Sequence, residues 1–197
     1  MPASKPRPSP GPALPAYDAA CAALAQQDAV AYQPAPPIEH NRCIAPAPVR
    51  VSAVRLAGGG TVTLEPGAVM RCAMALAMAD WVRDAVAPTA RDKLKAPLSG
   101  LRIADSYSCR TRDHLAGAKL SEHARANAVD IGAFEVGEGR WIAVNDAAAA
   151  AFLVTVRDRG CRYFNTVLGP GSDRWHTDNL HLDLEPRGPH HDGKYCH

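Results

Sequence analysis

The chain has 197 residues, of which 47% are apolar and 21% are charged, a composition typical of one globular domain of good size. Its formal net charge is only +2 and no run of Lys and Arg stands out, which argues against a nucleic-acid partner. No apolar run approaches the roughly 18 residues that a membrane span needs, so no transmembrane segment is expected.

The first half of the chain begins with a proline-rich segment, residues 1–16, which predicts a linker or a disordered tail before a folded domain at 17–197. An Ala-rich helix is predicted at 18–27, and the proline-rich stretch 33–48 is expected to be irregular. Residues 49–56 and 61–64 alternate like two strands of a hairpin around Gly58, Gly59 and Gly60. Residues 65–67 (EPG) predict a turn or helix start, followed by a long helix to Val86, with Pro88 beyond its end.

In the second half, strands are predicted at 101–107, 128–134, 141–144, 161–167 and 180–184. Residues 108–127 are polar and irregular, as expected of an active-site loop, and Asn145 or Asp146 caps a helix that runs to about Arg159. Helices and strands do not alternate regularly. We therefore expect an α+β fold with a small, mostly antiparallel sheet, flanked by helices and carrying a metal site.

Six cysteines are spread along the chain without a CxxC pair, which argues against a structural zinc knuckle. Their even number favours three disulfides and an oxidising compartment, although six buried thiols are the alternative. The spacing does not choose a pairing among Cys21, Cys43, Cys72, Cys109, Cys161 and Cys196. With no secretory signal visible at the start, disulfides point to the mature form of an exported protein.

Three residues form a candidate metal site. His123 and Asp130 lie in SEHARANAVD (121–130), and His181 lies in HTDNLHLD (176–183). Two histidines and an aspartate suit a zinc ion that keeps one coordination position open for water, which indicates a hydrolase. A lone His-Asp spacing is unspecific and His181 alone would pass for a core histidine. Asp130 in an apolar strand, however, needs a partner or a metal.

Other residues near these ligands have candidate roles. Asp178 stands three residues before His181 and is the first candidate for the general base, with His176 the second; a strand would put Asp178 on the opposite face from His181. Asp183 could hydrogen-bond a ligand histidine. Arg110, in SYSCR (106–110), could bind a substrate carboxylate or steady an oxyanion, although it could equally be an ordinary surface arginine.

These motifs carry a resemblance to known proteins. SEHARANAVD resembles the SxHxxGxAxD signature of D-alanyl-D-alanine peptidases, which belong with lysostaphin-like and Hedgehog-like zinc proteins, with Ala126 where glycine is usual. The wider pattern resembles the bacterial extensin-like C-terminal domain family over roughly residues 17–197. Its markers here are AMALAMADWV, SYSCR, SEHARANAVDI, FNTVLGPG and HLDLEPRG, together with the six cysteines.

The resemblance implies a periplasmic or otherwise exported zinc peptidase, acting on peptidoglycan stem peptides at the cell envelope. It implies zinc ligation by His123, Asp130 and His181, Asp178 as base, and Arg110 and Ser121 as substrate contacts. Many relatives have an assisting histidine where this chain has Asn179, and Asp178 is one methylene shorter than the usual glutamate. A weak or inactive peptidoglycan-binding module that keeps the metal is the alternative, and a metal-free, disulfide-stabilised structural domain is the third. A monomer is expected.

Overall fold

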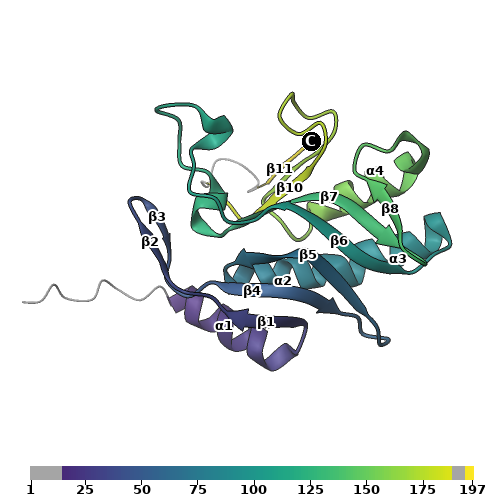
Figure 1. Ribbon diagram of the computed structural model, residues 1–197, viewed down its shortest axis with the longest axis horizontal. Helices are drawn as coiled ribbons and strands as arrows, with labels where there is room; N and C mark the ends of the chain where they lie inside the picture. The colour runs from purple at the N-terminus through teal and green to yellow at the C-terminus, as the bar shows by residue number, and fades with distance from the viewer. Residues whose placement is uncertain (1–14, 188–193) are drawn as a thin grey trace, which may run out of the picture.

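The computed structural model describes residues 15–187 and 194–197. Within these residues nine strands form one sheet, in which each neighbouring pair is antiparallel except β5–β6 and β9–β11 (Figure 1). From edge to edge the strands are β1 (Val30–Pro34), β4 (Val49–Arg55), β5 (Thr61–Met70), β6 (Leu98–Asp105), β7 (Ala128–Val136), β10 (Leu180–Asp183), β9 (Thr166–Leu168) and β11 (Tyr195–Cys196), with β8 (Arg140–Ala143) paired to β7. The predicted α+β class and mostly antiparallel pairing are confirmed, but the sheet is not small.

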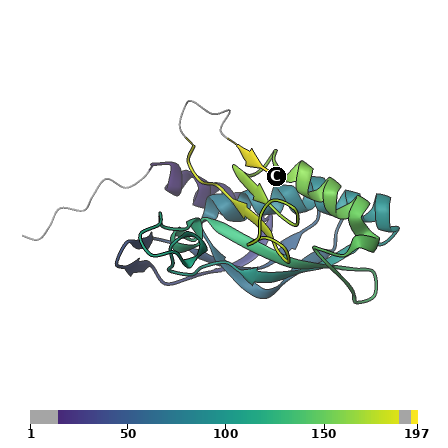
Figure 2. The ribbon, with the colours of Figure 1, turned by 90° about the horizontal axis from the view of Figure 1, so that it is seen from above.

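The α-helices gather on one face of this sheet (Figure 2). α1 (Pro15–Gln27) packs on α2 (Cys72–Trp81), and α4 (Ala150–Gly160) packs on the helical segment η1 (Val82–Val86). The buried indole of Trp81 ties the layers together, because its ring lies 6.2 Å from that of Phe134 and 5.9 Å from that of Phe164, and its N–H donates to the Val156 carbonyl at 3.3 Å. No described helix combines the length and the apolarity needed to cross a bilayer.

Alternation along β7 and β10 separates a helix-covered face from a polar one. Leu180 pairs with Ile131, and both side chains belong to the core. His181 pairs with Asp130 one residue further on, so these two side chains leave the sheet on the opposite face. The register therefore brings two of the predicted metal ligands face to face.

The three predicted disulfides are present, and the fold supplies the pairing. Cys21–Cys72 joins α1 to α2, and Cys161–Cys196 joins the end of α4 to β11. Cys43–Cys109 joins β3 (Cys43–Ala45) to the loop that follows β6. Each bridge connects segments that the sheet does not pair directly. No described cysteine is free, and three disulfides are consistent with an exported protein.

The first half of the chain differs from the prediction at residues 65–67, which continue β5 rather than starting a helix. The pairing of β4 with β5 shifts register between Val51 and Ala53, so residues 64–67 have no partner in β4, although Leu64 and Glu65 still pair with β6. Pro66, which has no N–H to donate, falls in this irregular stretch and leaves the rest of the ladder intact.

The long helix begins and ends later than predicted. It starts at Cys72 and continues through η1, α3 (Ala87–Thr89) and η2 (Ala90–Leu94), with Pro88 inside it. The turns on both sides of Pro88 are π-helical. Wider turns accommodate a residue that lacks an N–H and whose ring crowds the preceding turn, so the helical path survives the proline.

Smaller differences concern residues 33–48 and 161–167. Residues 33–48 contain the end of β1 and a separate hairpin of β2 (Ile38–His40) and β3, and the predicted strand at 161–167 is extended only in β9. Asp146 caps a helical segment as predicted: its side chain accepts the Ala148 N–H at 2.9 Å at the start of η5 (Ala147–Ala149), which leads into α4. Most of the predicted linker, residues 1–14, lies outside the described residues, and α1 begins at Pro15.

Candidate metal centre

His123, Asp130 and His181 meet on the polar face of the sheet. Asp130 and His181 are neighbours across β7 and β10, whereas His123 comes from a short helix, η4 (Glu122–Arg125), directly before β7. Ser121 begins η4, and its hydroxyl accepts the His123 N–H at 3.4 Å. The exposed fractions of the three residues are 0%, 8% and 9%, so the cluster is buried at the base of a cleft.

The donor atoms form a compact triangle. His123 Nε2 lies 3.2 Å from both His181 Nδ1 and Asp130 Oδ1, and His181 Nδ1 lies 2.8 Å from Asp130 Oδ1. A tetrahedral zinc ion with bonds of about 2.0–2.1 Å holds its donors roughly 3.3–3.4 Å apart. Two edges of the triangle lie close to that value, and the third needs only a small opening.

The second ring nitrogen of each histidine is already engaged. His123 Nδ1 lies 2.9 Å from the Ser106 carbonyl oxygen, and His181 Nε2 lies 3.0 Å from Asp183 Oδ2. Because a carbonyl and a carboxylate only accept, each of these nitrogens carries the proton of a neutral imidazole. His123 Nε2 and His181 Nδ1 then present lone pairs, which converge with a carboxylate oxygen on one point. Three acceptor atoms this close together repel one another unless a proton or a cation lies between them. The residues therefore fit a metal ion.

The charges around the triangle are strongly coupled. Burial opposes ionisation of Asp130, but hydrogen bonds from His123 and His181 outweigh it and hold the pKa of Asp130 well below its usual range. Burial also disfavours the charged form of His181, yet its contacts with Asp130 and Asp183 raise its pKa to about 9. The pKa of Asp183 is lowered by His181 despite burial. In the metal-free protein the cluster therefore retains a proton at neutral pH.

The triangle opens into a cleft of about 560 Å³, whose lining includes the predicted substrate contacts Arg110 and Ser121. Asp105, which pairs with Asp130 across β6 and β7, holds the arginine in place. Its Oδ2 lies 3.4 Å from Arg110 Nη2 and accepts the Ser108 hydroxyl at 2.7 Å, while Arg110 Nε donates to Ser108 at 3.1 Å. The positively charged guanidinium of Arg110 is thus fixed on the cleft wall beside the candidate metal ligands.

His176 also lines the cleft, with its ring centroid 5.5 Å from that of His181. Its Nδ1 lies 2.8 and 2.9 Å from the two carboxylate oxygens of Asp173, so Nδ1 carries the proton. The carboxylate of Asp173 has a lowered pKa because contacts with Trp175 and His176 outweigh its burial. His176 Nε2 then carries the lone pair of a ring that a carboxylate orients.

The structure does not bring Asp178 to the cluster. Asp178 is exposed and is absent from the residues that line the cleft, and its carboxylate accepts a hydrogen bond from Asn179 Nδ2 at 3.2 Å. Asn179 does line the cleft, and its Oδ1 is buried without a hydrogen-bond partner among the described residues. Both lie before β10, which begins at Leu180, so strand alternation does not govern where they point.

Ala126, which stands where the signature that this segment resembles has glycine, has a left-handed backbone with φ of 51° at the end of η4. Its N–H donates to the His123 carbonyl at 3.0 Å, and its own carbonyl accepts the Arg71 N–H at 2.7 Å. The backbone must turn here to deliver His123 ahead of β7. Alanine tolerates this conformation less well than glycine, which accounts for the usual glycine.

Two site residues were missed by sequence reasoning. Asp105 lies inside the predicted strand at 101–107 and ends β6, and its part in holding Arg110 is visible only once β6 is paired with β7. Asp173 stands three residues before His176, a spacing that could have suggested a His-carboxylate pair. Asp183, in contrast, contacts His181 as its position two residues later predicted.

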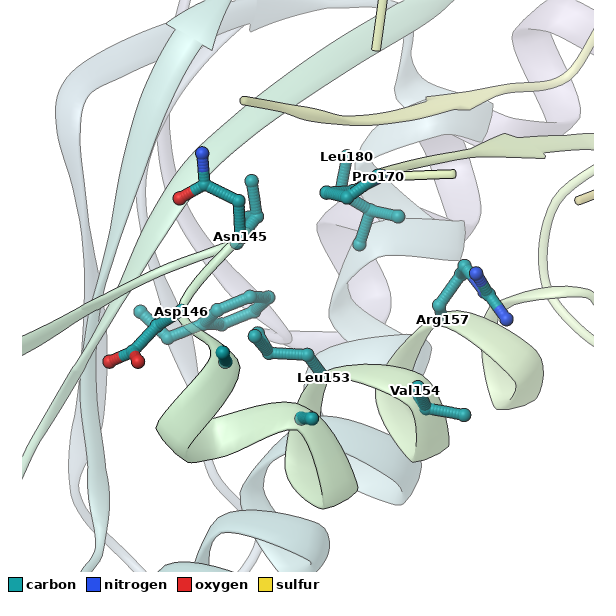
Figure 3. A pocket seen from close by; sticks show the side chains of 11 residues that line it. Asn145, Asp146, Leu153, Val154, Arg157, Pro170 and Leu180 are labelled. Carbon is teal, nitrogen blue, oxygen red and sulfur yellow. The ribbon is translucent and has the colours of Figure 1, made fainter. Parts of the chain in front are cut away.

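A second hollow, of about 170 Å³, lies between α4 and the end of β7 and is lined mainly by apolar side chains, among them Leu153, Val154 and Leu180 (Figure 3). It lies on the helix-covered face, because Leu180 and His181 leave β10 in opposite directions. Asp146 and Arg157 also border it, but no ligand triangle of the described residues converges there. The cleft on the polar face is therefore the better candidate for chemistry.

Comparison with known proteins confirms the resemblance to the extensin-like C-terminal domain family. A family described as Extensin-like protein C-terminus matches residues 19–197. No curated protein and no solved structure matches the chain.

Proposed function

We propose that this chain, which belongs to the extensin-like protein C-terminus family, is a zinc-dependent peptidase that hydrolyses amide bonds of peptidoglycan. The observation that carries the proposal is the convergence of three acceptor atoms beside a cleft with an anchored arginine. Its relation to the D-alanyl-D-alanine peptidases and to lysostaphin-like and Hedgehog-like zinc proteins is part of the proposal. That relation rests on SEHARANAVD and on DNLH (178–181), which resembles the closing motif of those proteins because an acidic residue stands three positions before the last ligand.

The ligand chemistry favours zinc over harder cations. Two imidazoles and one carboxylate are the three-protein-ligand set of catalytic zinc sites, whereas calcium and magnesium prefer oxygen donors alone. When bound, zinc would supply a Lewis acid that makes a water molecule acidic near neutral pH. The chain's residues would hold it through His123 Nε2, Asp130 Oδ1 and His181 Nδ1, with Ser106 and Asp183 orienting the two rings.

His176 is the best-supported proton acceptor. Its Nδ1 donates to Asp173, which leaves Nε2 to take a proton from the attacking water and later return it to the leaving amine. Asp178 is the alternative named by the resemblance, and it would have to turn inward from its exposed position. His176→Ala should therefore reduce kcat more than Asp178→Ala does.

Arg110 would bind the substrate's negative charge. A guanidinium can hold a carboxylate by two hydrogen bonds, or stabilise the charge that develops on a carbonyl oxygen. Its anchoring by Asp105 and Ser108 fixes the position of this charge before the substrate arrives. Ser121 lies beside it in the cleft lining and would offer the substrate a further polar contact.

The substrate class and location follow from the same proposal. Stem peptides of peptidoglycan lie outside the cytoplasm, and the three disulfides suit a periplasmic or otherwise exported protein at the cell envelope. Whether a free terminus or a cross-link is cut depends on how far substrate extends along the cleft.

The test is to measure the metal content of gently purified protein, and then to digest purified muropeptides and identify the products by mass spectrometry. We expect about one zinc per chain and cleavage that is lost on chelation and in Asp130→Asn. Asp158→Asn, a substitution at an exposed carboxylate away from the cleft, is the matched control. Protein without zinc and without cleavage would refute the proposal.

A second function, peptidoglycan binding without turnover, is favoured by Asn179. An amide cannot shuttle a proton at neutral pH, and many relatives have histidine there. If the chain and its Asn179→His variant both fail to cleave muropeptides, yet the chain is retained by insoluble peptidoglycan, binding is the better description. Cleavage that appears only in Asn179→His would identify Asn179 as the cause of inactivity.

A further inference from the structure

A groove of about 640 Å³ adjoins the metal cleft and is dominated by positive charge. Arg112 and Glu185 line both hollows, so groove and cleft are neighbours that share one wall. Two carboxylates, Glu122 and Glu185, face five cationic side chains in the lining: Arg42, Arg71, Arg112, Lys119 and Arg125. The whole chain has a net charge of only +2, so much of its positive excess is concentrated here.

Both carboxylates of the groove are already paired. Glu122 contacts Arg125 Nη1 at 3.0 Å and Asn127 Nδ2 at 2.6 Å. Glu185 contacts Arg112, and its other oxygen lies 3.3 Å from Arg187 Nη2. Among the described side chains, Arg42 and Lys119 are exposed and take part in no ion pair. The groove therefore keeps an unneutralised positive charge.

The groove is a built feature, because the fold holds its walls together. Arg42 stands at the turn of the β2–β3 hairpin, which Cys43–Cys109 ties to the loop after β6. Arg71 Nη2 donates to the Ile44 carbonyl at 3.0 Å and so secures the same hairpin. Arg112 and Lys119 lie on paired segments, since the Arg112 N–H donates to the Lys119 carbonyl at 2.9 Å. In both views of the ribbon the hairpin and this loop lie at the same end of the molecule (Figures 1 and 2).

We infer that this groove binds a peptide with closely spaced carboxylates, and that it receives the part of the substrate that extends beyond the metal cleft. The inference rests on the proposed function. Arginines recognise carboxylates by paired hydrogen bonds, and Leu120 and Pro186 give the lining an apolar part that a polypeptide can contact. No aromatic ring lines the groove in the described part of the chain, which disfavours the base stacking that single-stranded nucleic acids need. The metal cleft would then hold the scissile bond while the groove selects acidic flanking residues.

The experiment measures fluorescence anisotropy of labelled hexaglutamate and hexaglutamine peptides with the full chain. We expect tighter binding of hexaglutamate, weakening as salt is raised. Arg42→Glu/Lys119→Glu should raise its Kd roughly tenfold or more, because two attractive charges become repulsive. Arg91→Glu/Arg140→Glu makes the same change of net charge at two exposed positions on η2 and β8 and should raise the Kd less than about twofold. Circular dichroism checks folding, and Arg42→Gln/Lys119→Gln replaces the first pair if it does not fold.

The inference is overturned if hexaglutamine binds as well as hexaglutamate, or if both charge-reversed pairs lose equal affinity. It is also overturned if labelled oligothymidylate or hyaluronate binds more tightly than hexaglutamate, because the groove would then prefer a polyanion of another class. Binding of hexaglutamate is measured with and without EDTA. The two affinities should be equal, because none of the proposed metal ligands lines the groove. Intact hexaglutamate binding with no muropeptide cleavage counts against the proposed function alone, whereas cleavage without such binding counts against this groove alone.

Discussion

The imidazole of His181 is held between two carboxylates, with Nδ1 2.8 Å from Asp130 and Nε2 3.0 Å from Asp183. A metal ion can replace the contact at Nδ1, but the contact at Nε2 must remain to hold the ring in its orientation. Asp183 keeps Nε2 protonated and so leaves the lone pair on Nδ1. Asp183 therefore decides which ring nitrogen of His181 can bind the metal.

Replacing Asp183 by asparagine should weaken zinc binding by roughly 10–100-fold without removing a ligand. The amide can turn its N–H toward Nε2, and the ring would then protonate Nδ1, the nitrogen that must face the metal. Competition with a fluorescent chelator measures the affinity. Asp158→Asn, at an exposed carboxylate, is the control and should bind as wild type does. Equal affinity in Asp183→Asn would show that the tautomer is set by another group.

Zinc affinity should rise with pH by about tenfold per unit between pH 6.5 and 9, because His181, whose pKa is raised to about 9, must release one proton. Asp130 has a lowered pKa and is already ionised in this range. In the metal-free protein the charged His181 contact stabilises the fold fully below pH 6.5, and this contribution is lost as pH rises through 9. Calorimetry in buffers of different ionisation enthalpy counts the released protons. A pH-independent affinity would mean that His181 is neutral before the metal binds.

The sequence was sufficient to predict that His123, Asp130 and His181 meet in one cluster that could hold a metal ion, because a carboxylate within an apolar strand requires a partner or a metal, and histidines are donors that zinc prefers. It did not predict where Asp178 and Asp105 lie, for opposite reasons. Asp178 was placed by its distance along the chain from His181, but the segment before β10 is irregular and turns it outward. Asp105 was overlooked because its neighbour Asp130 is 25 residues away in the sequence and one strand away in the sheet.

At the scale of elements, a helix or strand was predicted correctly where tertiary pairing agreed with the local sequence signals, and incorrectly where it overrode them. The strand 128–134 and the helix capped at Asp146 were predicted from alternation and from capping, and both are present. Pro66 and Pro88 were interpreted as marking element boundaries. Both instead lie inside elements, because the irregular stretch of β5 and the π-helical turns around Pro88 accommodate them. A proline shows where a backbone N–H donor is missing, and the packing of the surrounding residues decides whether the strand or helix ends there.

Removing the Cys43–Cys109 bridge should loosen the loop that carries Arg110 while leaving the sheet intact. Cys109 precedes Arg110 directly, and its partner lies in the separate β2–β3 hairpin. Cys43→Ser/Cys109→Ser should therefore raise KM for muropeptides severalfold and lower the free energy of unfolding by about 2–4 kcal/mol. Cys21→Ser/Cys72→Ser is the matched control, since that bridge ties α1 to α2 and neither helix lines the cleft. Equal increases in KM would point to general destabilisation.

For the whole molecule, composition predicted one domain, but the extent of the sheet was not visible in advance. β9 and β11 are short and gain their order from partners distant in sequence. The basic groove shows the same limitation, because no segment of the chain is rich in Lys and Arg. Arg42, Arg71 and Lys119 come from three separate segments that the hairpin and the loop after β6 bring together.

Loading with zinc should stabilise the entire fold, because the ligands come from η4, β7 and β10 and are united only in the folded chain. At a free zinc concentration of about 100 times Kd, linkage contributes about 2.7 kcal/mol, which corresponds to a rise in Tm of roughly 5–11 °C for a chain of this size. Scanning calorimetry of metal-stripped and reconstituted protein, with disulfides kept oxidised, measures the shift. Asp130→Asn keeps the side-chain shape but removes the anionic ligand, so its Tm should respond little to zinc. A shift of the same size in that variant would place the stabilising zinc elsewhere in the molecule.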